Sequence, residues 1–140
     1  MRIIVDTNVF ISACIGKGAA SEVIRACIQD HAFPLMGASL FLEYEDVLSR
    51  DYLFSAARLN KAARYLLLDV FIAKCFWSDV YFEWRPNLRD EADNHLIELA
   101  IAGQAQWIVT GNIRDFRDAD LRFDQFSAVT PGRFLQELSK

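Results

Sequence analysis

Short runs of apolar residues alternate along the chain with longer segments whose apolar residues recur every three to four positions. The short runs predict strands buried on both faces, and the longer segments predict helices with one inward side. The predicted strands are Ile3 to Val5, Phe33 to Gly37, Trp107 to Thr110 and Ser127 to Val129, with a weaker candidate from Phe76 to Trp84 that Pro86-Asn87 interrupts. This order of elements favours an α/β fold in which a central parallel sheet lies between two layers of helices.

The helical segments are delimited by capping residues and by breaks in the apolar pattern. The predicted helices run from Ala20 through Ile28, from a Ser39 cap through Leu48, from Ser55 to Lys74, from about Ala92 to Gly103, and from the Thr130-Pro131 start through Leu138. Gly103 suits a helix C-cap. The polar residues Asp6-Thr7-Asn8 are expected to form a loop after the first strand.

The segment from Ser55 to Lys74 is predicted to form a longer helix than the others. Its expected inward residues are Leu59, Leu66, Val70 and Phe71, and its expected surface residues are Arg58, Lys61 and Arg64 or Tyr65.

Composition narrows the classes of protein that this chain can belong to. With 140 residues, of which 53% are hydrophobic, it is long enough for one domain spanning 1–140 and too short for two ordinary domains. Its net charge of −4 argues against broad electrostatic binding to nucleic acid, so any RNA must meet a local basic patch. The three cysteines have no disulfide or zinc spacing. The apolar start without a signal peptide and the lack of a membrane-spanning run favour a cytoplasmic protein.

Acidic residues occur where a parallel sheet binds its ligands, at the carboxyl ends of the strands. Asp6 follows the first predicted strand directly. Asp93 falls within the inward stripe of its predicted helix, although a helix N-terminus also favours an acid for electrostatic reasons alone. Asp90, one turn earlier, is a further candidate on the same side.

The helix after Ser39 contains three acids, Glu43, Glu45 and Asp46. Projection of that helix places Asp46 opposite the apolar face, and it places Glu43 and Glu45 at the two borders, so the spacing does not choose between them. His31 and His95 are expected to be surface residues.

Several short segments, taken together and in order, resemble the signature segments of PIN-domain proteins, and most closely those of the toxins of bacterial toxin–antitoxin pairs (VapC-like). These segments are Ile4-Val5-Asp6-Thr7-Asn8, Leu42 to Arg50, Asp90-Glu91-Ala92-Asp93-Asn94, Glu98-Leu99-Ala100, Ile108 to Asn112 and Thr130-Pro131. The resemblance covers nearly the whole chain. It implies a three-layer α/β/α PIN-like domain.

The resemblance also implies which residues form the site. Asp6, Glu43 and Asp93 match the acids that hold a divalent metal ion, with Glu43 chosen over Glu45. Where the family often has a fourth acid, this chain has Asn112, and we expect Asp115 to supply the missing charge. Asn8, Thr110 and Asn112 are candidates for positioning substrate.

Carboxylates gathered in this way need a divalent cation, because without one they repel each other at close range. Mg²⁺ and Mn²⁺ favour oxygen ligands, and a metal ion beside a phosphodiester polarises it and activates water. The expected cofactor is therefore Mg²⁺ or Mn²⁺, as one or two ions.

The resulting hypothesis is a metal-dependent endoribonuclease that acts as the toxin of a toxin–antitoxin pair, with an antitoxin protein as partner and a homodimer as its assembly. The candidate RNA contacts are Arg50, Arg58, Lys61, Arg64, Arg114 and Arg117. The alternative, favoured by Asn112, is a catalytically weak PIN-like module that binds RNA or protein. A haloacid-dehalogenase-like phosphatase is disfavoured because Asn8 stands where its second acid is needed, and a receiver domain because its lysine is missing.

Overall fold

The computed structural model describes residues 1–80, 94–114 and 126–140, and for Asn94 the backbone only. Five strands in this part of the chain form one parallel sheet in the order β3-β2-β1-β4-β5. The strands are β1 (Arg2–Val5), β2 (Phe33–Met36), β3 (Phe76–Trp77), β4 (Trp107–Val109) and β5 (Ser127–Val129). The buried strand β1 lies at the centre, with Val5 in register with Val109 of β4.

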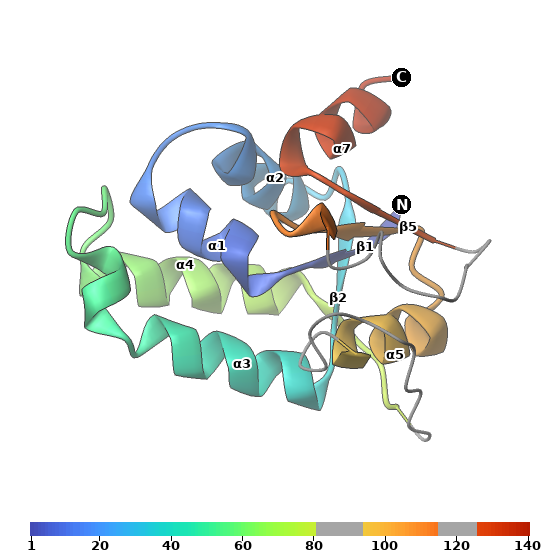
Figure 1. The fold of residues 1–140 in the computed structure, drawn as a ribbon, viewed down its shortest axis with the longest axis horizontal. Helices are drawn as coiled ribbons and strands as arrows, with labels where there is room; N and C mark the ends of the chain where they lie inside the picture. The colour runs from blue at the N-terminus through green and yellow to red at the C-terminus, as the bar shows by residue number, and fades with distance from the viewer. Residues whose placement is uncertain (81–93, 115–125) are drawn as a thin grey trace.

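Six α-helices cover the sheet within the described residues. They are α1 (Thr7–Ile15), α2 (Ala19–Ile28), α3 (Ala38–Leu48), α4 (Lys61–Lys74), α5 (Asn94–Gly103) and α7 (Pro131–Leu138), and the 3-10 helix η1 (Asp51–Phe54) precedes α4. Helix α2 contacts α1, α4 and α7, whereas α5 contacts β1, β2 and β4 from the opposite side of the sheet (Figure 1). The predicted three-layer α/β/α architecture is confirmed. In this same part of the chain, every helix is too short or too polar to cross a membrane.

A cluster of three buried aromatic rings joins α3 to the central strand. The ring of Tyr44 on α3 lies 5.4 Å from that of Phe10 on α1 and 5.9 Å from that of Phe71 on α4. The hydroxyl of Tyr44 donates a hydrogen bond of 2.6 Å to the carbonyl oxygen of Val5, the last residue of β1. Because a buried hydroxyl is costly to leave unpaired, this bond holds α3 beside the end of β1.

The first helix was missed by the sequence pattern. Asp6-Thr7-Asn8 does not form a loop: Asp6 is the N-cap residue and α1 begins at Thr7. Apolar side chains cover most of the circumference of α1, with Val9 and Cys14 buried and Ile11 partly buried. A helix that is apolar on most sides shows little helical periodicity in its sequence. The turn-forming residues at its start therefore led to the prediction of a loop.

Two helix boundaries and one inward face also differ from the prediction. Helix α3 begins at Ala38 with Gly37 as its N-cap, so Ser39 lies inside the first turn. Helix α4 begins at Lys61, where Asn60 caps it by accepting a 2.8 Å hydrogen bond from the amide of Ala63. Leu66 and Val70 are exposed, and the buried residues of α4 include Leu68 and Phe71.

Arg64 or Tyr65 was expected at the surface, and Arg64 was a candidate RNA contact, but the side chain of Arg64 is only 4% exposed. Its guanidinium donates to the carbonyl oxygen of Leu48 at 3.1 and 3.2 Å, forms an ion pair with Asp51 and lies over the ring of Phe54. A buried cation is tolerated when it is paired and hydrogen-bonded in this way, so Arg64 joins α3, η1 and α4 and is not available to RNA.

The C-terminus of α5 depends on a glycine for reasons of space. Gly103 is the last residue of the helix, and Gln104, with a φ of 58°, adopts the left-handed conformation expected of a C-cap glycine. A Cβ atom on Gly103 would lie 2.6 Å from Cδ1 of Leu35 and 2.9 Å from Oγ of Ser78. The glycine therefore lets α5 approach the sheet closely.

Gly103→Ala is expected to lower the free energy of unfolding by about 1 to 3 kcal/mol, because the added methyl group would overpack this contact. The matched control is Gly132→Ala in α7, where nothing lies within 4 Å of the new Cβ atom. That variant should gain roughly 0.5 to 1 kcal/mol, since glycine weakens a helix relative to alanine. Urea unfolding measures both, and equal effects at the two positions would contradict the close packing of α5.

Candidate functional site

The site is built around Asp6, at the junction of β1 and α1. The side chain is buried, and its backbone amide donates to the carbonyl oxygen of Val109, which continues the pairing of β1 with β4. The amide of Val9 donates to the carbonyl oxygen of Asp6 and closes the first turn of α1. The carboxylate therefore lies at the carboxyl end of the central strand and at the positive end of a helix dipole, where an anion is favoured.

Uncharged donors from the start of α1 and the end of β4 hold the Asp6 carboxylate. Its Oδ2 atom accepts from the hydroxyl of Thr110 at 2.8 Å and from the amide nitrogen of Asn8 at 3.2 Å. The Oδ1 atom of Asn8 accepts from the amide of Gly111 at 2.9 Å, and the hydroxyl of Thr110 accepts from the amide of Asn112 at 3.0 Å. These bonds join the ends of β1 and β4 into one rigid polar network around Asp6.

Glu43 faces the same junction from α3. Its Oε1 atom accepts from the hydroxyl of Thr7 at 2.8 Å, and its Oε2 atom lies 2.6 Å from Nε2 of His95 at the start of α5. Glu45 and Asp46 are exposed. The prediction that Asp46 lies away from the core is confirmed, and of the two border residues it is Glu43 that faces Asp6.

The two carboxyl groups have opposite pKa shifts. Burial raises the pKa of Asp6, and the negative charge of Glu43 adds to this, while the hydrogen bond from Thr110 opposes it. Burial also acts to raise the pKa of Glu43, but the hydrogen bonds from His95 and Thr7 and the charge of His95 together outweigh burial and lower it. Glu43 is therefore held as the anion, whereas the ionised form of Asp6 is costly in the metal-free protein.

His95 was expected at the surface, and this expectation is wrong. Its side chain is 18% exposed, and it pairs with Glu43. The projection of α5 correctly placed His95 away from the apolar stripe of that helix, but α3 packs against α5 on that side. The spacing of apolar residues within one helix does not reveal its contacts with another helix that is far away in the sequence.

Four of the predicted site residues, Asp90, Asp93, Asp115 and Arg117, lie outside the described residues. Their assignments stay predictions. The side chain of Asn112 is exposed, and only its backbone amide joins the network of Thr110.

The described residues supply part of a metal site. Within residues 1–80, 94–114 and 126–140, no three His, Cys, Asp or Glu side chains converge closely enough to hold a metal ion. Two oxygen-donor carboxylates do belong to this junction, because Glu43 is hydrogen-bonded to Thr7, the residue after Asp6, and no described Lys or Arg forms an ion pair with either one. Asp6 and Glu43 therefore fit a hard divalent cation, which would relieve the cost of the Asp6 charge.

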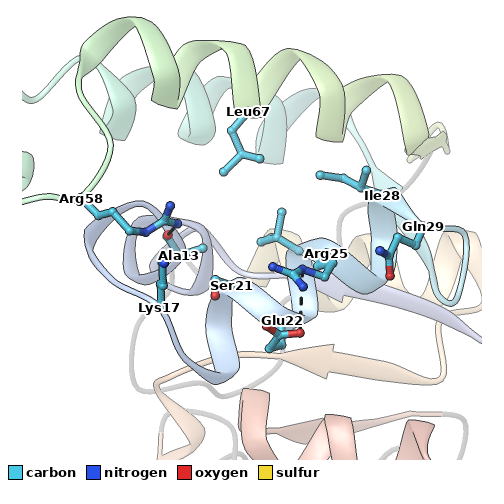
Figure 2. Close-up of a pocket in the computed structure, with 10 residues that line it drawn as sticks. Ala13, Lys17, Ser21, Glu22, Arg25, Ile28, Gln29, Arg58 and Leu67 are labelled. Atoms are coloured by element: carbon cyan, nitrogen blue, oxygen red, sulfur yellow. Dashed lines mark hydrogen bonds and ion pairs between the residues drawn. The ribbon is translucent and has the colours of Figure 1, made fainter.

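The basic residues predicted to contact RNA lie in different places. Arg50 is exposed and forms an ion pair with Asp46, Lys61 lies 3.8 Å from Asp51, and Arg114 is exposed. Arg58 donates to the carbonyl oxygen of Ala13 and lines a pocket of about 330 Å³ between α1, α2 and α4 (Figure 2). That pocket also contains Lys17 and Arg25, and none of its lining residues belongs to the carboxylate network.

A parallel α/β sheet with carboxylates at the carboxyl end of its central strand defines a class of proteins with an acidic, cation-attracting site. A family model described as PIN domain matches residues 2–114, which is more than half of the chain. The chain therefore belongs to the PIN-domain family, whose members are generally nucleases that hydrolyse nucleic acids and typically use Mg²⁺ or Mn²⁺. No curated protein and no solved structure matches the chain.

Proposed function

We propose that this protein is an endoribonuclease that depends on Mg²⁺ or Mn²⁺. The observation that carries the proposal is that two differently held carboxylates lie at the carboxyl end of the central strand: Asp6 itself, and Glu43, which accepts a hydrogen bond from Thr7, the residue directly after Asp6. Membership of a family of nucleases supports the same conclusion. RNA, rather than nucleic acid in general, is the substrate that the resemblance to toxins implies.

Asp6 and Glu43 are the described residues that would hold the metal, and Asp93, with Asp90 and Asp115, would complete the set of acids. When bound, the cation would polarise the phosphodiester and activate water. The surrounding residues keep the two carboxylates in position: Thr110 and Asn8 orient Asp6, and Thr7 and His95 orient Glu43. Partners of this kind fix the rotamers of metal-binding side chains.

The same proposal extends to the biological setting. We infer that the nuclease is a toxin of the VapC-like kind, that it acts in the cytoplasm as a homodimer, and that a separate antitoxin protein silences it. This step rests on the order of the PIN-like segments in the sequence, from Asp6 through Asn112. Arg50, Arg58, Lys61, Arg114 and Arg117 remain the candidates for contact with the RNA backbone.

A catalytically weak module that binds RNA or protein is the second candidate function. The observation in its favour is Asn112, because an amide replaces a carboxylate where the family often has one, and only its backbone joins the described network.

A circular single-stranded RNA separates the two functions, because only an endonuclease can linearise it. We expect the purified protein to linearise the circle with Mg²⁺ or Mn²⁺ and to lose this activity completely in EDTA. Readdition of Mn²⁺ should restore it. Binding of the circle without linearisation, with either metal ion, would instead establish the binding module and refute the nuclease.

A further inference from the structure

A second cavity adjoins the carboxylate network on the α5 side. It has a volume of about 320 Å³ and is lined by residues from the start of α3, the chain after β3 and the first part of α5. Gly37 follows β2 and Ser78 follows β3, so the cavity opens at the same edge of the sheet as Asp6. Ligands of open parallel sheets bind along this edge.

Two structural links place the cavity directly beside the proposed reaction site. His95 lines the cavity and also pairs through Nε2 with Glu43. Ser39, another lining residue, lies four positions before Glu43 on α3, and residues at this spacing have Cβ atoms about 5 to 6 Å apart on one side of a helix. A nucleoside attached to a phosphodiester held at Glu43 would therefore lie beside this cavity.

The lining of the cavity distinguishes a nucleobase from a phosphate. Val80 contributes exposed apolar surface, the buried side chains of Leu40 and Leu99 complete the apolar wall, and Ser39 and Ser78 contribute hydroxyl groups. The described lining residues include no Lys or Arg that could pair with a phosphate. A flat, uncharged ring with polar edges matches apolar walls that carry a few hydrogen-bonding groups.

The size of the cavity also favours a nucleobase as its ligand. Its volume of about 320 Å³ stands near the lower limit of roughly 300 Å³ for small-molecule sites, which suits a single ring system better than a larger ligand. Proteins that recognise single-stranded RNA bind splayed-out bases in such pockets and read their edges by hydrogen bonds.

We propose that this cavity, lined by Ser39, Ser78, His95 and Leu99, binds one base of the RNA next to the cleaved phosphodiester and so selects the cleavage site. The inference rests on the proposed nuclease function and adds a determinant of specificity to it. Ser39 and Ser78 are the side chains that would hydrogen-bond the base, and Val80 would pack on its ring.

The test blocks the cavity from its exposed rim and removes one base at a time from the RNA. Ala38 is exposed in the first turn of α3 and lines the cavity, and Ala62 is exposed in the first turn of α4 and does not. Ala38→Phe is the blocked variant and Ala62→Phe its matched control. The substrates are one short RNA of a cleaved sequence and a series in which each position near the cleavage site is abasic in turn.

For the wild type and Ala62→Phe, kcat/KM should fall at least about tenfold when one particular position is abasic, as expected for the loss of one bound base. In Ala38→Phe, kcat/KM for the intact RNA should be about equal to kcat/KM for the RNA that is abasic at this position. If the wild type cleaves RNA but shows no abasic position with this effect, the base site is refuted while the nuclease stands.

A binding measurement keeps the inference testable if the protein cuts no RNA, which would refute the proposed function. The probe is an RNA series with 2-aminopurine at one position, observed by fluorescence in EDTA. A change of intensity at one position with the wild type and Ala62→Phe, absent with Ala38→Phe, would support the base site. No position-specific change, or the same change with all three proteins, would overturn it.

Discussion

Asp6→Asn is expected to abolish RNA cleavage and, at the same time, to raise the stability of the metal-free protein. The loss of activity should exceed about 100-fold, the upper end of the loss caused by removing an outer partner of a metal ligand. Stability should rise because burial and the charge of Glu43 raise the pKa of Asp6, so its ionised form is costly at neutral pH. The asparagine can still accept the hydrogen bond from Thr110.

The pH dependence of this stability effect has a definite sign. Between the ordinary pKa of 3.8 and its raised value in the fold, the native protein holds a proton that the unfolded chain has released. The free energy of unfolding of the wild type therefore falls as the pH rises through this window, and this contribution is absent in Asp6→Asn. The difference between the two proteins should be largest at neutral pH and smallest below pH 3.8.

Urea unfolding in EDTA and cleavage with Mn²⁺ measure the two effects. Asp46→Asn is the control, because Asp46 is exposed and pairs only with Arg50 among the described residues. It should leave cleavage unchanged. A folded Asp6→Asn protein that cuts RNA at the wild-type rate would remove Asp6 from the site.

Glu43→Gln is expected to abolish cleavage to a similar extent, more than about 100-fold, but to lower stability instead of raising it. Hydrogen bonds from His95 and Thr7 outweigh burial and lower the pKa of Glu43, so the fold favours its charged form. Weakening these charge-assisted bonds should cost about 1 kcal/mol at neutral pH. In the wild type this contribution is present above the ordinary pKa of 4.5 and is lost as the pH falls toward the lowered value.

Glu45→Gln provides a matched control, since it makes the same change two residues away on the exposed side of α3. Activity and stability should both stay close to the wild type. The opposite signs expected for Asp6→Asn and Glu43→Gln in EDTA distinguish a site with two unlike carboxylates from a general effect of removing charge. Equal stabilisation by both variants would contradict the role given to His95.

The candidate acids could be found in the sequence to different degrees. Asp6 was predictable because it follows a buried strand, and the carboxyl end of a strand is where a parallel sheet binds ligands. Glu43 and Glu45 lie at the two borders of the apolar face of one predicted helix, and the residue pattern alone did not choose between them. The resemblance to PIN-domain segments pointed to Glu43, and the structure brings it to Asp6 through Tyr44, whose hydroxyl bonds to Val5.

Apart from α1, the order of the main strands and helices follows from the sequence by itself, because the spacing of apolar residues and the capping chemistry are local properties of neighbouring residues. The strands at Ile3 and Trp107 and the cap at Thr130 were predictable for this reason. Helix α1, the burial of Arg64 and the pairing of His95 with Glu43 were decided only in the tertiary structure. Each depends on a partner that is distant in the sequence: the aromatic cluster around Phe10, the carbonyl of Leu48, and the meeting of α3 with α5. Such contacts form only in the tertiary structure, so the local sequence around a residue does not predict them.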